Sequence, residues 1–148
     1  MLSEIFTPTH IKLDLESTTK ADVFEELIET IADDNAEFDR QELLEAVTMR
    51  ENKMATIIKP GIAIPHGYSR TISGIIGAIG FSRAGIEYDQ IDCDPVHLFF
   101  MLLMDESSRE QHLQVFGHLW DLLNSAAFSD EIRKLRTPQE VYSLLSRF

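Results

Sequence analysis

The sequence predicts an α/β (α+β) fold in which one mixed β-sheet is sandwiched between helices on both faces, a three-layer α/β/α arrangement. Helical patterns occupy the first and last thirds of the chain, and a strand-rich segment from Ile57 to Leu103 lies between them. Within that segment, Val96 to Leu103 is apolar at nearly every position, which is typical of a central strand covered on both sides. The length of 148 residues is typical of one compact domain, so residues 1–148 are expected to form a single domain.

The first third of the chain predicts one short strand and two amphipathic helices. Apolar and polar residues alternate from His10 to Leu15, as in a half-buried strand. A helix is expected from Thr18-Thr19 to about Ala32, because apolar residues recur there at helical spacing, namely Val23, Phe24, Leu27, Ile28 and Ile31. A second helix is expected from Asp39 to about Asn52, with Glu42 completing a capping box three residues after Asp39.

The rest of the chain predicts strands first and then helices. The expected strands are Ile62–Ile64, Ile75–Phe81 and Val96–Leu103. The spacing of Gly74, Gly77 and Gly80 favours close packing on a strand over a dinucleotide-binding loop. The expected helices are a long one from Ser107-Ser108 to about Ser125 and two shorter ones near residues 130–135 and 138–145.

Charge and composition exclude several classes of partner. The net charge is -12, from 25 acidic and 13 basic residues. This balance argues against nucleic acid and anionic membranes, and it favours either a basic protein partner or simple solubility. No apolar run reaches the roughly eighteen residues of a membrane span, and residues 1–4 lack the basic start of a signal peptide, so a cytoplasmic protein is expected. Cys93, the single cysteine, lies between two aspartates that disfavour its thiolate and is interpreted as structural.

His66 is the first candidate for chemistry. It follows Ile64-Pro65, where an apolar strand is expected to end, and the ring of Pro65 makes that exit rigid. Gly67 carries no side chain, which would let a phosphate or another backbone approach the imidazole closely. A rigid strand end that presents one imidazole at an open rim suits a nucleophile. A turn histidine without function is the alternative that local sequence leaves open.

His112 is the second candidate. It falls on the apolar stripe of the predicted helix from Ser108, which is formed by Phe116, Leu119, Trp120 and Leu123. The positive end of the helix disfavours a second proton on the ring, so a neutral imidazole is expected. Such a ring can donate a hydrogen bond to a phosphoryl oxygen. The alternative is a core histidine bonded to a carbonyl group.

Arg50 is the third candidate. It follows Leu43 and Val47 at helical spacing, so a guanidinium extends an otherwise apolar face and could clamp a phosphate. A role at the carboxyl end of its helix is the equal alternative. The other histidines suggest no metal site: His118 lies about 240° around the helix from His112, His97 reads as a core residue, and His10 has no informative neighbours.

Together these residues resemble the fructose/mannitol-type enzyme IIA domains of the sugar phosphotransferase system, and in particular the nitrogen-related single-domain form. The segment Gly-Ile-Ala-Ile-Pro-His-Gly at residues 61–67 is similar to the phosphorylation-site motif of that family. Arg50-Glu51 and Gln111-His112-Leu113 are similar to its arginine–glutamate pair and its second active-site histidine. Residues 88–92 and 95–103 are similar to the nitrogen-type members, and the resemblance extends from about Ile11 to Leu145.

The resemblance implies a mannitol/fructose IIA-like fold and a phosphohistidine carrier that needs no metal and no organic cofactor. His66 would accept the phosphoryl group from HPr or an HPr-like donor, with His112 and Arg50 stabilising it and Gly67 and Thr56 beside it. The group would then pass to a IIB domain during sugar uptake. A hydrolase is remote, since no Gly-x-Ser-x-Gly segment is present. A monomer and a homodimer both stay open.

A regulatory role is the alternative that the resemblance leaves open. In that case the phosphorylation state of a nitrogen-type IIA domain controls its binding to kinases, transporters or transcription regulators without onward transfer. The sequence also departs from the family in the segment before the motif, which is usually rich in glycine. Here Ala55-Thr56-Ile57-Ile58-Lys59-Pro60 retains the Thr56 hydroxyl, stiffens the rim, and offers Lys59 as a second cation for the phosphate.

Overall fold

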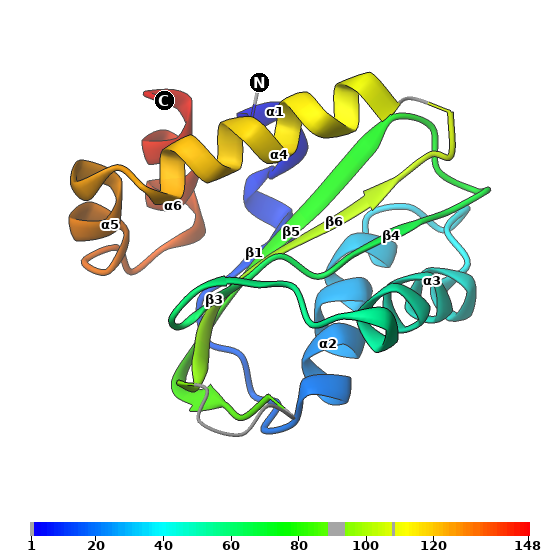
Figure 1. The fold of residues 1–148 in the computed structure, drawn as a ribbon, viewed down its shortest axis with the longest axis horizontal. Helices are drawn as coiled ribbons and strands as arrows, with labels where there is room; N and C mark the ends of the chain where they lie inside the picture. Colours follow the sequence, from blue (N-terminus) through cyan, green and yellow to red (C-terminus); the bar gives the residue numbers. More distant parts are fainter. Residues whose placement is uncertain (1, 89–93, 108) are drawn as a thin grey trace.

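A three-layer arrangement forms the fold of this chain. The computed structural model describes residues 2–88, 94–107 and 109–148. In Figure 1 a twisted mixed sheet runs through the centre, with α2 (Lys20–Ala32) and α3 (Arg40–Lys53) on one face and α4 (Arg109–Leu123) across the other. The α/β/α prediction is therefore confirmed. The structural interpretation of Cys93 and the similarity noted at residues 89–92 fall outside the described residues.

The remaining elements are short apart from two long strands. The helical ones are α1 (Leu2–Ile5), the 3-10 turn η1 (Pro8–His10), α5 (Ala126–Ile132) and α6 (Pro138–Ser146). The strands are β1 (Ile11–Lys12), β2 (Ile57–Lys59), β3 (Ile62–Ala63), β4 (His66–Tyr68), β5 (Ile75–Ile86) and β6 (Val96–Met104). None of the helices in the described part of the chain is long and apolar enough to cross a membrane.

The sheet is organised around β6. Its strand order is β1-β5-β6-β3-β2, and β4 also pairs with β6. The long β5 is antiparallel to β6, whereas β3 and β4 are both parallel to it and pair with successive parts of the same edge. Every described residue of β6 except His97 is buried, as predicted for a central strand between two helical layers.

Two apolar cores lie on opposite faces of this sheet. One joins α1, α4, α5 and α6 to side chains such as Phe100 and Leu102, and the other joins α2 and α3 to Phe99, Met101 and Leu103. The alternation along β6 follows the two-residue period of a strand. The sheet thus presents one face to α4 and the other to α3, and the short β4 lies between these two helices.

The predicted starts of α2 and α3 are confirmed by their caps. The Thr19 hydroxyl accepts a hydrogen bond from the backbone of Asp22, and the Asp39 carboxylate accepts from the backbones of residues 41 and 42. The reciprocal half of the expected capping box is wrong. The Glu42 carboxylate instead accepts hydrogen bonds from the Ser69 hydroxyl and the backbone of Arg70, which ties α3 to the segment after β4.

Several boundaries differ from those expected. The strand predicted to end at Phe81 continues to Ile86 through a register irregularity. The short strands β2 and β4 were not expected, because two or three residues carry no readable period. The helix expected near residue 130 begins four residues earlier, with the Ser125 hydroxyl capping the Phe128 backbone. Trp120, expected on the apolar stripe of α4, is 51% exposed.

Candidate functional site

The short strand β4 decides where His66 points. It runs parallel to β6 with His66 paired to Leu102, so His66 and Tyr68 face one side of the sheet and Gly67 the other. On that side lies α4. The ring of Phe116 meets the ring of His66 edge-on, with centroids 4.9 Å apart, and the ring of His112 lies 5.5 Å from that of Tyr68. The structure thus places both candidate histidines in the contact between β4 and α4.

The immediate surroundings of His66 fix its tautomer. Its Nδ1 lies 3.0 Å from the carbonyl oxygen of Ile64. A carbonyl oxygen only accepts hydrogen bonds, so Nδ1 carries the hydrogen and Nε2 keeps the lone pair. Burial lowers the pKa of His66, and the positive charge of Arg50 lowers it further, against the Ile64 hydrogen bond and the Glu51 charge, which raise it. The ring is therefore neutral at neutral pH and presents Nε2 as its nucleophilic atom.

The expected exposure of His66 is wrong. The residue belongs to a short strand rather than to an exit beyond a strand, and it is only 8% exposed. The reason is β4 itself, whose pairing with β6 draws the ring against α4. A partner must therefore approach the edge of the ring rather than a fully open imidazole.

His112 lies on α4 with both nitrogens unused. It is 3% exposed, and neither ring nitrogen makes a hydrogen bond with a described residue. Its Nε2 lies 3.7 Å from a carboxylate oxygen of Asp105, which is too long for a hydrogen bond. The predicted position on the apolar stripe is confirmed, and the alternative of a histidine bonded to a carbonyl group is not what the structure contains.

Arg50 and Glu51, in the last turn of α3, make separate sets of contacts. One guanidinium nitrogen of Arg50 donates to the Met54 carbonyl oxygen at 3.1 Å, while its charge acts on His66. Glu51 is 4% exposed, and its carboxylate accepts from both the backbone and the hydroxyl of Thr56 and pairs with Lys20 at 3.3 Å. Thr56, expected beside the phosphate, therefore donates its hydroxyl hydrogen to Glu51.

Two residues expected beside the phosphate contact other parts of the chain. A side chain added to Gly67 would meet the backbone of Ala46 and Val47 at 2.7 Å, so the absence of a side chain lets α3 approach β4. The ammonium group of Lys59 donates to the carbonyl oxygen of Leu123 at 3.2 Å. Leu123 lies eleven residues after His112, about 16 Å along α4, so Lys59 is not a cation of this site.

The other histidines have separate surroundings. His10 is buried and lies 2.7 Å from the Asp34 carboxylate, His97 lies 2.8 Å from the Ser82 carbonyl oxygen, and His118 lies 3.1 Å from that of Phe148. Within residues 2–88, 94–107 and 109–148, no group of three or more His, Cys, Asp or Glu side chains is placed to hold a metal.

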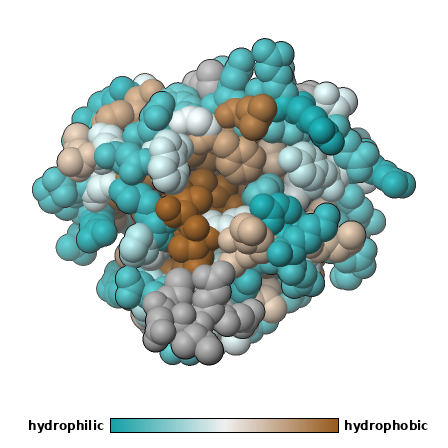
Figure 2. Space-filling view, viewed as in Figure 1, coloured by the Kyte–Doolittle hydropathy of each residue, from teal (hydrophilic) through white to brown (hydrophobic). Residues whose placement is uncertain are grey.

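The surface around the site carries several exposed apolar side chains. A cavity of about 640 Å³ is lined by Tyr68, Glu106, Arg109, His112, Leu113 and Phe116. Leu113 is 73% exposed, and Met54, next to the Arg50 guanidinium, is 69% exposed. Exposed apolar side chains such as these are typical of a surface that meets another protein. A separate hollow with apolar side chains, surrounded by hydrophilic ones, lies between the end of α4 and the β2–β3 segment (Figure 2).

The sequence placed Phe116 on the same stripe of α4 as His112, but it did not predict that the Phe116 ring would meet the ring of His66. Tyr68 is two residues after His66 and shares its face only because β4 is a strand. No signal in the sequence marked that three-residue strand.

Comparison with known proteins places the chain in one family. The family model described as "Phosphoenolpyruvate-dependent sugar phosphotransferase system, EIIA 2" matches residues 4–148. The fructose-specific EIIABC component of Bacillus subtilis is 35% identical over 133 residues, which are 90% of this chain and 20% of that protein. The nitrogen regulatory protein of Pseudomonas aeruginosa is 30% identical over 97% of this chain and 94% of its own length.

The same relationship holds in three dimensions. The crystal structure of the nitrogen regulatory protein IIA-Ntr from Neisseria meningitidis superimposes with a TM-score of 0.87 at 28% sequence identity, covering 97% of this chain and 98% of that one. The sheet and both helical layers are therefore shared with a solved structure along nearly the whole chain.

Proposed function

The chain belongs to the EIIA 2 family of the phosphoenolpyruvate-dependent sugar phosphotransferase system, and from this premise we propose that it carries its phosphoryl group on His66. It is a phosphocarrier, a component that transfers phosphoryl groups. The observation that carries the assignment to His66 is the hydrogen bond from its Nδ1 to the Ile64 carbonyl oxygen at 3.0 Å. That bond leaves a neutral ring with its lone pair on Nε2.

The transfer step follows from that tautomer. Nε2 attacks the phosphorus of a donor phosphohistidine, the new N–P bond forms as the donor N–P bond breaks, and the donor imidazole leaves with the bonding pair. Nδ1 of His66 keeps its hydrogen and donates it to the Ile64 carbonyl oxygen throughout, and this bond stabilises the positive charge that the ring gains. No proton needs to move in this step.

Arg50 and His112 supply the charge stabilisation that phosphoryl transfer needs. The charge of Arg50 already reaches His66, since it lowers the pKa of that ring. His112 offers two ring nitrogens without hydrogen-bond partners in the described structure, one of them 3.7 Å from the Asp105 carboxylate. Both groups fit donors to the equatorial oxygens of the phosphoryl group. The buried surroundings exclude the water that would hydrolyse it.

The partners proposed are an HPr-like phosphodonor and a IIB-like acceptor in the cytoplasm. A solved structure titled as the complex of the mannitol IIA enzyme with phosphorylated IIB shares the fold, with a TM-score of 0.78 at 18% identity. The exposed apolar side chains of Tyr68, Leu113 and Met54 give such partners a surface to dock on. We leave a homodimer out of the proposal.

The test is phosphorylation in a defined mixture. The protein is incubated with phosphoenolpyruvate, enzyme I and HPr, and its intact mass is followed. We expect the gain of one acid-labile phosphate in the wild type and none in His66→Ala, with His97→Ala as a matched control that is phosphorylated normally. Phosphorylation of His66→Ala at the wild-type rate would reject His66 as the acceptor.

A regulatory role is the second candidate. It is supported by the nitrogen regulatory protein of Pseudomonas aeruginosa, which matches this chain over nearly the full length of both, whereas the fructose EIIABC component is five times longer than the matched segment. In that case phosphorylation of His66 changes affinity for another protein without onward transfer. Incubating the phosphoprotein with purified IIB domains separates the two: transfer to one supports the carrier in sugar uptake, and transfer to none supports regulation.

A further inference from the structure

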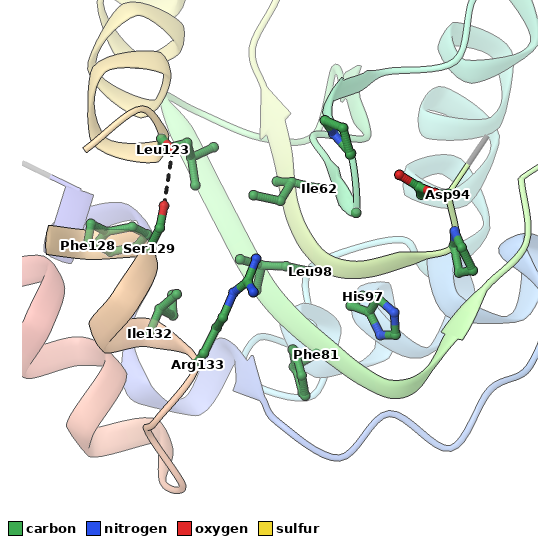
Figure 3. A pocket seen from close by; sticks show the side chains of 13 residues that line it. Ile62, Phe81, Asp94, His97, Leu98, Leu123, Phe128, Ser129, Ile132 and Arg133 are labelled. Carbon is green, nitrogen blue, oxygen red and sulfur yellow. Dashed lines mark hydrogen bonds between the residues drawn. The ribbon is translucent and has the colours of Figure 1, made fainter. Parts of the chain in front are cut away.

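Two adjoining cavities far from His66 form one groove on the face of the sheet that α4 covers. Their volumes are about 520 and 780 Å³, and they share Phe81, Leu98, Ile132 and Arg133. The floor comes from β5 and β6, and one wall comes from the end of α5 and the segment that follows it (Figure 3). We call this region the basic groove, for the cations described next.

The charge of this groove is the opposite of the charge of the whole chain. Two carboxylates line it, those of Asp14 and Asp94. Its cations are Lys12, Arg83, Arg133, Lys134 and Arg136. Five of the 13 basic residues thus gather at one place in a protein with 25 acidic residues. A local excess of positive charge in such a protein attracts anions to that place.

Most of these cations have no partner among the residues that the structure describes. Lys12 pairs with Glu26 at 2.8 Å. The side chains of the other four make no ion pair and no hydrogen bond with any residue in the described part of the chain. These four are Arg83, Arg133, Lys134 and Arg136. In Figure 3 the Arg133 guanidinium extends across the opening toward Leu98, over the apolar floor. A guanidinium held over apolar surface keeps its donors available for a ligand anion.

The groove is separate from the phosphorylation site. Leu98, in its floor, lies four residues before Leu102, the partner of His66 in the sheet, and therefore about 13 Å away along β6. No residue of the cavity beside His112 lines the groove. A ligand in the groove would therefore leave His66 accessible to its phosphodonor.

We propose that the basic groove binds an organic anion that carries two or more negative charges on an apolar or aromatic body, the chemistry of a nucleoside polyphosphate. The apolar floor of Phe81, Leu98 and Ile132 takes the body, and Arg83, Arg133 and Arg136 take the charges. Each of the two cavities, at about 520 and 780 Å³, lies within the roughly 300–1,000 Å³ that ligand pockets commonly measure. Neither the phosphoryl transfer nor its regulation requires this site.

The test uses the full chain with adenosine triphosphate as the probe, followed by isothermal calorimetry and by amide shifts in NMR spectra. Adenosine and tripolyphosphate serve as the separate halves of the probe. We expect saturable binding of the whole probe, weaker binding of each half, and shifts confined to the groove. The double variant Arg133→Glu/Arg136→Glu should lose about tenfold or more in affinity, while its NMR spectrum shows it to be folded.

The matched control is Lys53→Glu/Arg70→Glu, which makes the same change of charge at exposed positions outside the groove. It should bind the probe with nearly the wild-type affinity, and both variants should accept phosphate from HPr at the wild-type rate. The proposal would be rejected if both variants lost the same affinity for the probe, or if tripolyphosphate bound as tightly as the whole probe. Either result would show that the groove attracts anions only by nonspecific charge. Binding of a hexaglutamate peptide without binding of the probe would reject it in favour of an acidic protein partner.

Discussion

At the scale of single residues, the two imidazoles of the site are held in different ways. The Ile64 carbonyl oxygen fixes Nδ1 of His66 as the protonated nitrogen, and burial keeps the ring neutral. His112 lacks such a partner and is instead held by its packing on Tyr68, with Asp105 nearby. In the proposed mechanism, His66 is the nucleophile, and the N–H of His112 is available to the phosphoryl group.

Replacing His112 with alanine should separate acceptance from stabilisation. We expect His112→Ala to take up phosphate still but to transfer it about 10- to 100-fold more slowly, because one donor to the transition state is lost while Nε2 of His66 is unchanged. Rapid-quench measurement of both half-reactions gives the two rates. Wild-type rates in both would remove His112 from the site.

The lowered pKa of His66 predicts a pH dependence of stability. In the unfolded chain the ring takes up a proton at its ordinary pKa near 6.5, whereas in the folded chain burial delays that protonation to lower pH. The unfolded state therefore binds more protons below pH 6.5, and the free energy of unfolding should fall as the pH falls through that range. Urea titrations should show a smaller fall for His66→Gln. An identical fall in the variant would contradict the lowered pKa.

At the scale of elements, the contact between α3 and β4 holds the site together. β4 is three residues long, and its central residue is Gly67, whose missing side chain is replaced by the backbone of Ala46 and Val47. The end of α3 then brings Arg50 and Glu51 toward the motif, where Glu51 holds Thr56. Gly67 thus influences the site indirectly, because its missing side chain lets α3 come close enough to place Arg50 and Glu51.

Replacing Gly67 with alanine should lower the stability of the folded protein. Its Cβ would lie 2.7 Å from backbone atoms that cannot rotate away, so α3 or β4 must shift, and we expect a loss of about 1–3 kcal/mol in the free energy of unfolding. Chemical denaturation measures it. The matched control is Gly117→Ala in α4, where nothing lies within 4 Å and a gain of up to about 1 kcal/mol is expected. An unchanged stability of Gly67→Ala would show that this contact is looser than described.

At the scale of the whole molecule, the surface divides into regions of different chemistry. The rim of the site is apolar and exposed at Tyr68 and Leu113, the basic groove gathers cations at the other end of α4, and the rest of the chain carries the acidic excess. Phosphoryl transfer needs short-lived encounters with two proteins, and an apolar rim in an acidic surface suits basic partners. In our proposals, the first region meets partner proteins and the second binds an anionic ligand.

A charge on the apolar rim should weaken those encounters. We expect Leu113→Asp to raise the KM for phosphorylated HPr by about tenfold with little change in kcat, because a docking contact is lost while the reacting groups stay in place. Steady-state transfer kinetics measure both. Gln114→Asp adds the same charge at the next position of α4, outside the cavity lining, and should change the KM far less. Equal effects of the two variants would place the docking surface elsewhere.

The sequence by itself determined the longer helices and strands, whose apolar pattern repeats over many residues, and it identified the candidate histidines and arginine. The caps at Thr19 and Asp39, the buried strand β6 and the apolar side of α4 that carries His112 were all predicted from local spacing. The motif at residues 61–67 gave the family. These features could be predicted because each depends on residues that are close in the chain, where steric preference and amphipathic period act directly.

Only the tertiary structure decided how those parts meet. Pairing with β6 turned the expected open strand exit into the strand that buries His66, and the approach of α3 gave Gly67 its role. The bond of Lys59 to Leu123 spans 64 positions of the chain, and the cations of the basic groove come from three separate segments. Such contacts follow from the packing of the whole sheet and its helices. That packing balances many small contributions to the free energy of folding from residues far apart in the chain, which a local sequence pattern does not show.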